Sequence, residues 1–220
     1  MQKPRNKIKA VLFDLDGTLI DSIPFHIESF VGLFDFFGVK LSHSRVCSVI
    51  RLPSREIYEK LEAKKLLGLN RKEFISERQK FYYSLIKGKN LLFPGSFEVV
   101  RKLKKKGFLV ALVTNSSKKT MMHSTPKKFL SLFDSIVCFD DVKKGKPSPQ
   151  PFLLAMKKIK VTPFQCIVVG DSVLDVISAN RAGIKNVIGV STGVSSEKEL
   201  KENGAKVIKK NLIQTLDFIH

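Results

Sequence analysis

Short apolar runs alternate along the chain with amphipathic segments of helical length. The apolar runs, rich in valine and isoleucine, predict β-strands at residues 9–13, 108–113, 135–139, 165–169 and 186–190. The amphipathic segments predict helices near residues 96–106, 120–130, 149–158, 173–181 and 196–203. This alternation is typical of crossover helices that join parallel strands, so we expect an α/β fold with a doubly wound parallel sheet.

The segment from residue 21 to residue 92 interrupts this alternation. It contains no convincing strand, but apolar residues recur at helical spacing, at Ile27, Phe30, Val31, Phe34 and Phe37. We expect an inserted α-helical cap over residues 21–92 and a catalytic core made of residues 1–20 and 93–220. Ligands of doubly wound sheets bind at the carboxyl ends of the strands, where such an insertion would overhang the first strand. The alternative is a helical bundle that serves only stability.

The composition is that of an ordinary globular protein. Hydrophobic residues make up 43% of the 220 positions and charged residues 27%. No apolar run approaches the ~20 residues that span a bilayer, and the chain starts without a signal-peptide core. The three cysteines lack metal-type spacing, and Cys138 and Cys166 lie in apolar runs, which indicates buried thiols in a reducing compartment. We expect a cytoplasmic protein with no membrane partner.

The formal net charge of +19 raises the question of a nucleic-acid partner. The lysines, however, are spread in short groups such as Lys104-Lys105-Lys106, without an aromatic-interleaved stripe or a recognised nucleic-acid module. A solvated basic surface is the simplest interpretation. A field that attracts anionic phosphorylated substrates comes second, and dedicated nucleic-acid binding is a minor alternative.

The first predicted strand ends in Asp14-Leu15-Asp16-Gly17-Thr18. Residues two apart in an extended chain point to the same face, so the carboxylates of Asp14 and Asp16 emerge side by side. A divalent cation held by hard oxygen ligands would offset their repulsion. Gly17 allows the backbone to turn sharply after the two acids. The alternative is a strand-end turn with solvated aspartates.

Three further segments place polar side chains at the same edge of the predicted sheet. Thr114-Asn115-Ser116 follows the second strand and offers a hydroxyl, an amide and free N–H groups that suit a phosphate. Lys146-Pro147 lies in a loop that the proline stiffens. Gly170-Asp171-Ser172 follows the fourth strand, with Asp175 one helical turn further on. Each segment alone is commonly a cap, a solvated lysine or a turn, but together they predict a site.

In this order, the four motifs resemble those of the haloacid dehalogenase-like hydrolases, in the branch that carries a helical cap after the first motif. The resemblance extends over essentially the whole chain. Within this branch, the chain is similar to the phosphoglycolate phosphatase and β-phosphoglucomutase-like members. It implies a five-stranded Rossmann-like sheet. It also implies Mg²⁺-dependent hydrolysis of a small phosphorylated metabolite, such as a sugar phosphate or a phosphoglycolate-like ester.

The resemblance also implies a role for each motif. Asp14 would be the nucleophile that forms an aspartyl-phosphate, and Asp16 the general acid and base. Thr114 would donate to a phosphoryl oxygen, Asn115 would help to bind the substrate, and Lys146 would stabilise the charge of the transition state.

The same resemblance implies a metal site. Mg²⁺ would be held by the carboxylate of Asp14, the main-chain carbonyl of Asp16 and the carboxylate of Asp171. Asp175 would lie in the coordination shell or just outside it.

Two residues of the expected cap are candidates for contact with the substrate. His26 lies near the expected hinge, and the alternative is a packed hinge residue. Arg55 would bind a second anionic group through its guanidinium, and the alternative is a solvated arginine in the first turn of a helix. Arg51 departs from the small, glycine-led loop of many relatives, so their substrate specificity does not transfer.

Two other functions compete with the phosphatase. A sugar phosphomutase needs the same nucleophile but must rebind a bisphosphorylated intermediate and exclude water. A non-catalytic protein could use its basic surface to bind RNA or DNA, although a pure binder has no need for four aspartates around one pocket.

Overall fold

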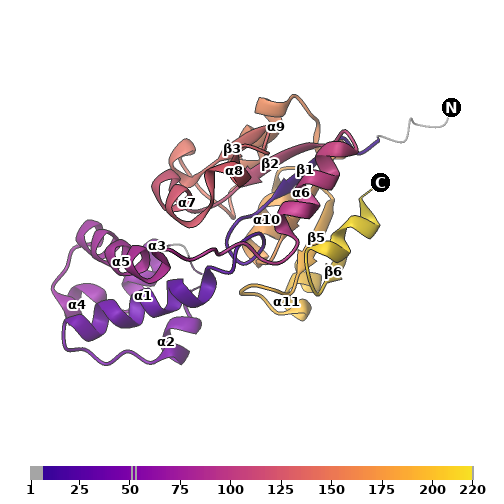
Figure 1. Ribbon diagram of the computed structural model, residues 1–220. Helices are drawn as coiled ribbons and strands as arrows, with labels where there is room; N and C mark the ends of the chain where they lie inside the picture. Colours follow the sequence, from indigo (N-terminus) through magenta and orange to yellow (C-terminus); the bar gives the residue numbers. More distant parts are fainter. Residues whose placement is uncertain (1–6, 51, 53, 220) are drawn as a thin grey trace. The chain divides into compact units, whose positions relative to one another are not determined.

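The chain forms two compact units in the computed structural model, which describes residues 7–50, 52 and 54–219 without the side chains of residues 54 and 55. One unit runs to Asp21 and resumes at Leu91, and it contains the sheet (Figure 1). The other, Ser22–Asn90, is helical. We call them the sheet unit and the helical unit.

Six strands among the described residues form one parallel sheet in the order β3-β2-β1-β4-β5-β6. They are β1 Ala10–Phe13, β2 Leu109–Val113, β3 Ser135–Val137, β4 Cys166–Gly170, β5 Asn186–Val190 and β6 Val207–Lys209. Every residue of β1 and β4 is buried, as expected for apolar strands covered on both faces. The predicted α/β class and doubly wound parallel sheet are therefore confirmed.

The five-stranded sheet implied by the resemblance is wrong by one strand. β6 pairs with β5 at the edge of the sheet, with Ile208 opposite Gly189. All three residues of β6 are half-buried, and lysines flank the short apolar pair Val207-Ile208. Such a short, partly charged segment carries no strand pattern of its own, so its pairing depends on the neighbouring strand.

Helices cover both faces of the sheet. They are α6 Ser96–Lys105, α7 Lys118–Ser124, α8 Lys127–Leu130, α9 Gln150–Ile159, α10 Val173–Arg181 and α11 Glu197–Glu202, with 3₁₀ turns at Phe139–Asp141, Pro163–Gln165 and Ile213–Phe218. The single helix expected over residues 120–130 is wrong, because Thr125 is extended before Pro126 and the chain divides into α7 and α8.

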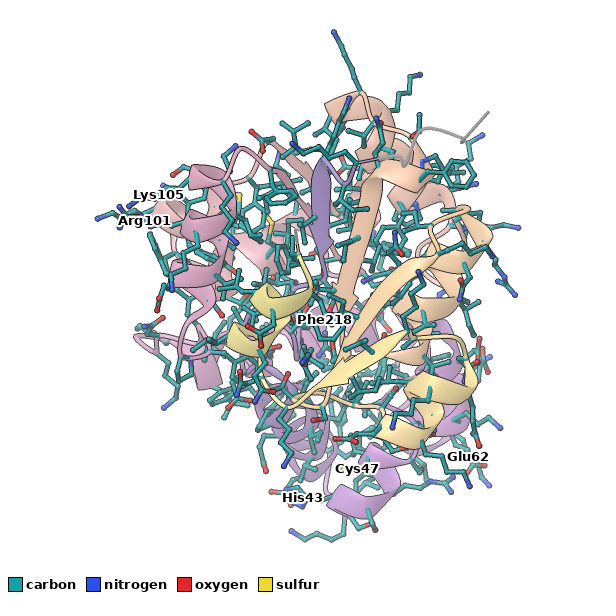
Figure 2. All side chains as sticks on the ribbon, turned by 90° about the vertical axis from the view of Figure 1, so that its right-hand side faces the viewer. His43, Cys47, Glu62, Arg101, Lys105 and Phe218 are labelled. Atoms are coloured by element: carbon teal, nitrogen blue, oxygen red, sulfur yellow. The ribbon has the colours of Figure 1, made fainter. Side chains whose placement is uncertain are left out.

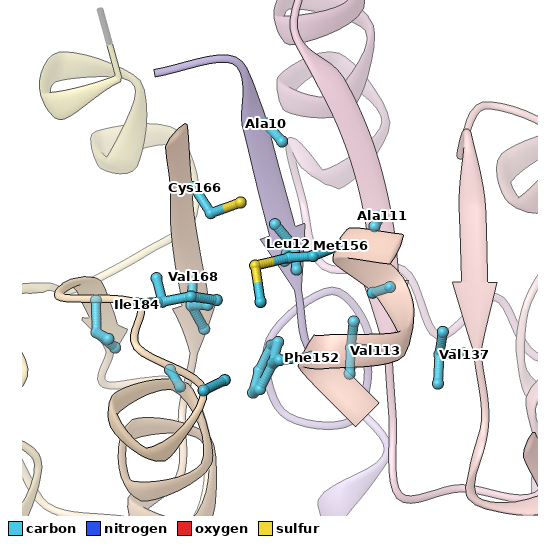
Figure 3. Packing of buried hydrophobic residues seen from close by; sticks show 14 of the residues in the cluster. Ala10, Leu12, Ala111, Val113, Val137, Phe152, Met156, Cys166, Val168 and Ile184 are labelled. Carbon is cyan, nitrogen blue, oxygen red and sulfur yellow. The ribbon is translucent and has the colours of Figure 1, made fainter. Parts of the chain in front are cut away.

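One apolar core lies between the sheet and helices α9, α10 and α11. Phe152 and Met156 of α9 pack beside Leu12 of β1 and Val113 of β2 (Figure 3). Ala10 and Leu12 belong to this core, whereas the alternate residue Val11 is buried on the opposite side. Burial on both faces fixes the strand ends rigidly, which positions the side chains that follow them.

The helical unit has a core of its own. It contains α1 Ile23–Phe36, α2 His43–Cys47, α3 Ser54–Lys60, α4 Ala63–Leu67 and α5 Arg71–Ile86. α1 packs along α5, and Phe30 and Phe34 of α1 contact Phe74 of α5. The predicted helical spacing thus places Phe30 and Phe34 inside, while Phe37 lies after the end of α1 and is exposed.

The basic residues of the sheet unit lie mainly on its surface. Arg101 and Lys105 extend from α6 into solvent (Figure 2). Lys102 and Lys104 of the same helix pair with Glu98 and Asp134. None of the helices among the described residues combines the length and apolarity needed to cross a bilayer.

Candidate active site

The sheet brings its polar strand ends together at one edge. β1 lies between β2 and β4, so Asp14 after β1, Thr114 after β2 and Asp171 after β4 are neighbours. Gly17 turns the chain away after the first acids with φ +82°, the left-handed conformation expected from the sequence. This carboxyl edge is where ligands bind in doubly wound sheets.

Lys146 is buried among acceptors at this edge. Its Nζ donates to Asp14 Oδ1 at 2.5 Å, to Asp175 Oδ1 at 2.5 Å and to the Val113 carbonyl at 3.0 Å. Burial by itself lowers the pKa of Lys146, but the charges of Asp14 and Asp175 raise it above its usual value. The lysine therefore stays charged.

The environment of Asp14 disfavours its charge. Burial raises the pKa of Asp14 well above its ordinary value, and Lys146 opposes that shift. The nearby carboxylates of Asp175, Asp171 and Asp16 raise the pKa of Asp14 further. A second positive charge near these acids would relieve the repulsion.

Asp171 is also buried, but it has neutral partners. Thr18 Oγ1 donates to Asp171 Oδ1 at 2.9 Å, and the Val194 N–H donates to Asp171 Oδ2 at 2.9 Å. Burial and the charge of Asp175 raise the pKa of Asp171 to about 7, although these two hydrogen bonds and Lys146 lower it. Thr18 was predicted only as part of the first motif, and the Val194 N–H has no signal in the sequence.

Asp175 lies in the first turn of helix α10 and contacts Lys146. Its Oδ2 accepts from the Ser172 hydroxyl at 2.6 Å within a capping box, and its Oδ1 contacts Lys146. Carboxylate oxygens of Asp14, Asp171 and Asp175 lie within 4.8 Å of one another. Hard oxygen donors at this spacing fit a cation such as Mg²⁺.

Asp16 is held by the loop after β2. Its Oδ2 accepts from the Ser116 hydroxyl at 2.7 Å and from Thr114 Oγ1 at 3.4 Å. The Ser116 N–H in turn donates to Thr114 Oγ1 at 2.9 Å. Ser116 is thus a site residue for which the sequence predicted no individual role, although its place in the Thr114-Asn115-Ser116 motif was a signal.

Asn115 lies at the edge but faces the loop of Lys146. Its amide nitrogen donates to the Lys146 carbonyl at 3.0 Å, and its amide oxygen accepts from the Lys146 N–H at 2.8 Å. Both ends of the amide are therefore used to hold the main chain of Lys146.

The candidate residues of the expected cap lie in the helical unit. His26 of α1 stacks on the Tyr82 ring at 4.2 Å, and its Nδ1 lies 3.2 Å from Arg78 Nη1. Arg78 was not predicted, because one arginine among many basic residues in a helix carries no distinct signal. Arg51 lies outside the described residues, and so does the side chain of Arg55.

The fold and the edge site together are those of an α/β enzyme. Residues 11–190 match the model of a family described as haloacid dehalogenase-like hydrolases, so the chain belongs to this family. The family predicted from the four motifs is confirmed.

Known relatives cover nearly the whole chain. The phosphorylated carbohydrates phosphatase of Thermotoga maritima is 30% identical over 92% of this chain and 94% of its own. The pyrophosphatase PpaX of Halalkalibacterium halodurans is 27% identical over 97% of both chains. A solved structure from Thermotoga maritima, provisionally named β-phosphoglucomutase, has a TM-score of 0.78 at 26% identity and covers 97% of this chain and 100% of that one.

Proposed function

We propose that the chain is a Mg²⁺-dependent phosphatase that hydrolyses a small phosphorylated metabolite through an aspartyl-phosphate on Asp14. The observation that carries the proposal is the buried contact between Lys146 Nζ and Asp14 Oδ1. It holds one oxygen of the carboxylate, while no described residue donates to Asp14 Oδ2. We therefore assign Oδ2 as the atom that attacks phosphorus.

In the first step, Asp14 Oδ2 attacks the phosphorus and the bond from phosphorus to the leaving oxygen breaks. Asp16, which Ser116 orients, gives its proton to the leaving oxygen. Lys146 offsets the negative charge of the nucleophile and of the transferring group, and the Thr114 hydroxyl would donate to a phosphoryl oxygen in place of its long contact with Asp16. The products are an aspartyl-phosphate and a free alcohol, or a phosphate ion where the substrate is pyrophosphate.

In the second step, a water molecule attacks the same phosphorus. Asp16, now a carboxylate, takes the proton of that water. The bond between phosphorus and Asp14 breaks, which releases phosphate and restores both acids. Asp16 is half-exposed, so water can reach it.

Asp14, Asp171 and the Asp16 carbonyl would hold Mg²⁺, with Asp175 in the coordination shell or beside it. The donor set supports this assignment, because it consists of oxygen atoms and is crowded with like charge. When bound, Mg²⁺ supplies positive charge between the acids and the phosphoryl group.

The names of the relatives suggest two substrate classes, phosphorylated carbohydrates and pyrophosphate. We propose that the helical unit is the cap that selects between them. His26 of α1 and Arg78 of α5, which contact each other, are the candidates in this unit for contact with the substrate, and Arg55 would add a second guanidinium.

The test is a screen with Mg²⁺ of sugar phosphates, phosphoglycolate and pyrophosphate, in which free phosphate is measured. We expect net phosphate release that Asp14→Asn lowers by about 10³-fold or more, because the amide cannot act as the nucleophile. Asp217→Asn, at an exposed aspartate, is the matched control and should leave the rate unchanged. Substantial turnover by a folded Asp14→Asn protein would overturn the mechanism.

The likeness to the structure named β-phosphoglucomutase favours a second candidate, a sugar phosphomutase. A mutase would convert one sugar phosphate into its isomer, would depend on a bisphosphate primer and would release little phosphate. Measuring isomer and phosphate in the same reaction separates the two functions.

A further inference from the structure

The carboxylate of Asp171 lies between two glycines. A Cβ atom built on Gly193 would lie 1.7 Å from Asp171 Oδ2, and one built on Gly17 would lie 2.6 Å from the same atom. Both distances are far shorter than van der Waals contact. The carboxylate therefore occupies space that a side chain at either position would need.

The two glycines are required for different reasons. Gly17 has φ +82°, which favours glycine whatever its neighbours. The φ of Gly193 lies outside the left-handed region, so alanine could adopt its backbone conformation. The obstacle to a side chain at Gly193 is the Asp171 carboxylate itself.

The segment 192–195, which follows β5, is tied to the ends of β1 and β4. The Thr192 hydroxyl donates to the Gly17 carbonyl at 2.6 Å, and the Val194 N–H donates to Asp171 Oδ2 at 2.9 Å. The Ser195 N–H donates to the Asp171 carbonyl at 3.3 Å, and Ser195 Oγ accepts from the Val173 N–H at 3.1 Å. These bonds hold Gly193 against Asp171.

Two donors fix the rotation of the carboxylate. Thr18 contacts Oδ1 and Val194 contacts Oδ2, so turning the group would break both hydrogen bonds. The group is 1% exposed, so water could not replace them readily. The carboxylate is thereby held within reach of Asp14.

We infer that segment 192–195 is a positioning element for the divalent cation, with Gly193 as its central residue. Gly193 acts through Asp171. Because Gly193 has no side chain, the Asp171 carboxylate fits between Gly17 and Gly193, and the N–H of Val194 fixes the orientation of that carboxylate. The inference rests on the proposed function, because it assigns Asp171 as a ligand. Groups that orient metal ligands commonly change metal affinity by about 10–100-fold.

The test is a Mn²⁺ titration of the full-length protein, with free Mn²⁺ measured by electron paramagnetic resonance. We expect Gly193→Ala to raise the Kd for Mn²⁺ by about 10–100-fold, because the new methyl group displaces the carboxylate. Gly189→Ala is the matched control: its Cβ meets Ile208 Cδ1 at 2.7 Å and Leu200 Cδ1 at 3.0 Å, which are the ends of flexible side chains. Its Kd should equal that of the wild type.

A second pair of variants keeps the inference testable where Gly193→Ala fails to fold. Thr192→Val keeps the shape but removes the hydroxyl that ties segment 192–195 to the Gly17 carbonyl, so it should raise the Kd for Mn²⁺ several-fold, and Thr192→Ser should restore it. If the wild-type protein binds Mn²⁺ and either Gly193→Ala or Thr192→Val binds it with the same Kd, the inference is overturned while the proposed metal site stands. A wild-type protein that binds no Mn²⁺ at millimolar concentration would overturn the proposed metal site as well.

Discussion

At the scale of single residues, the acidic side chains of the site outnumber the basic ones. The carboxylates of Asp14, Asp16, Asp171 and Asp175 share one edge of the sheet, and Lys146 contacts two of them. Like charges in a buried place raise one another's pKa, so a fully ionised cluster is costly without a further cation. The stability of the protein should therefore depend on pH and on metal together.

We expect Mg²⁺ to raise the melting temperature more at pH 7.5 than at pH 5.5. The pKa of Asp171 rises from 3.8 to about 7 on folding, so the native acid binds more protons than the unfolded chain. Its contribution to stability is full below pH ~4 and is lost as pH rises through about 7. Without metal, the free energy of unfolding should therefore fall as pH rises over that range. Bound Mg²⁺ should restore this free energy at the higher pH, because it binds ionised carboxylates.

Thermal melts with chelator and with Mg²⁺ at both pH values measure this effect. Asp171→Asn, which cannot ionise at this position, is the control and should show a smaller pH-dependent response to Mg²⁺ than the wild type. An equal shift at both pH values in the wild-type protein would contradict the prediction.

The cysteines should differ in reactivity. Cys138 and Cys166 are buried, as their apolar context predicted, and burial raises the pKa of Cys138 to about 11 and that of Cys166 to about 12. Cys47 is exposed on α2. Because the thiolate is the nucleophile, iodoacetamide at pH 8 should add one label to the native protein and three after unfolding. Mass spectrometry counts the labels, and rapid labelling of Cys166 in the native state would contradict the burial.

At the scale of elements, local signals set several helix starts. α5 begins with a capping box: the Asn70 side chain accepts from the N–H groups of Lys72 and Glu73, and Glu73 accepts from the Asn70 N–H. These bonds satisfy donors that the first turn of a helix otherwise leaves unpaired. α5 carries Phe74 of the helical core, so its start also holds that core in place.

Asn70→Ala should lower the free energy of unfolding by about 1 kcal/mol, because the cap hydrogen bonds are lost. Urea unfolding followed by circular dichroism measures the change. Asn70→Asp keeps an acceptor at the same place and should cost less than the alanine variant. Equal losses in both variants would show that the side-chain cap does not stabilise α5.

At the scale of the whole molecule, the main question is whether the formal net charge of +19 serves a nucleic-acid partner. On α6, Arg101 and Lys105 extend into solvent, while neighbouring lysines pair with acids (Figure 2). Charge of this kind attracts polyanions weakly and without sequence preference. It would also draw anionic substrates toward the protein.

Heparin or duplex DNA columns should therefore retain the protein only at low salt. We expect elution near physiological salt, since released counterions dominate such binding. The Asp14→Asn protein should elute with the wild type, because we expect the buried acids at the carboxyl edge of the sheet to take no part in such binding. Retention well above physiological salt would favour the nucleic-acid-binding alternative.

The sequence by itself determined which residues lie at the carboxyl edge of the sheet. Continuous apolar runs specify buried parallel strands, and the polar residues that interrupt them fall at strand ends, as Asp14, Thr114 and Asp171 do. Ser172 and Asp175 form their capping box within four residues. These features follow from the order of neighbouring residues, so pattern and spacing reveal them.

Only the tertiary structure decided what each group contacts. Ser116 reaches Asp16 across 100 positions, and Thr192 reaches Gly17 across 175. The short edge strand β6 forms through its hydrogen bonds with β5. Glycine is required at position 193 because the Asp171 side chain occupies the space that a Cβ atom would need. Such contacts arise when distant segments pack together, and the local pattern of polar and apolar residues does not record them.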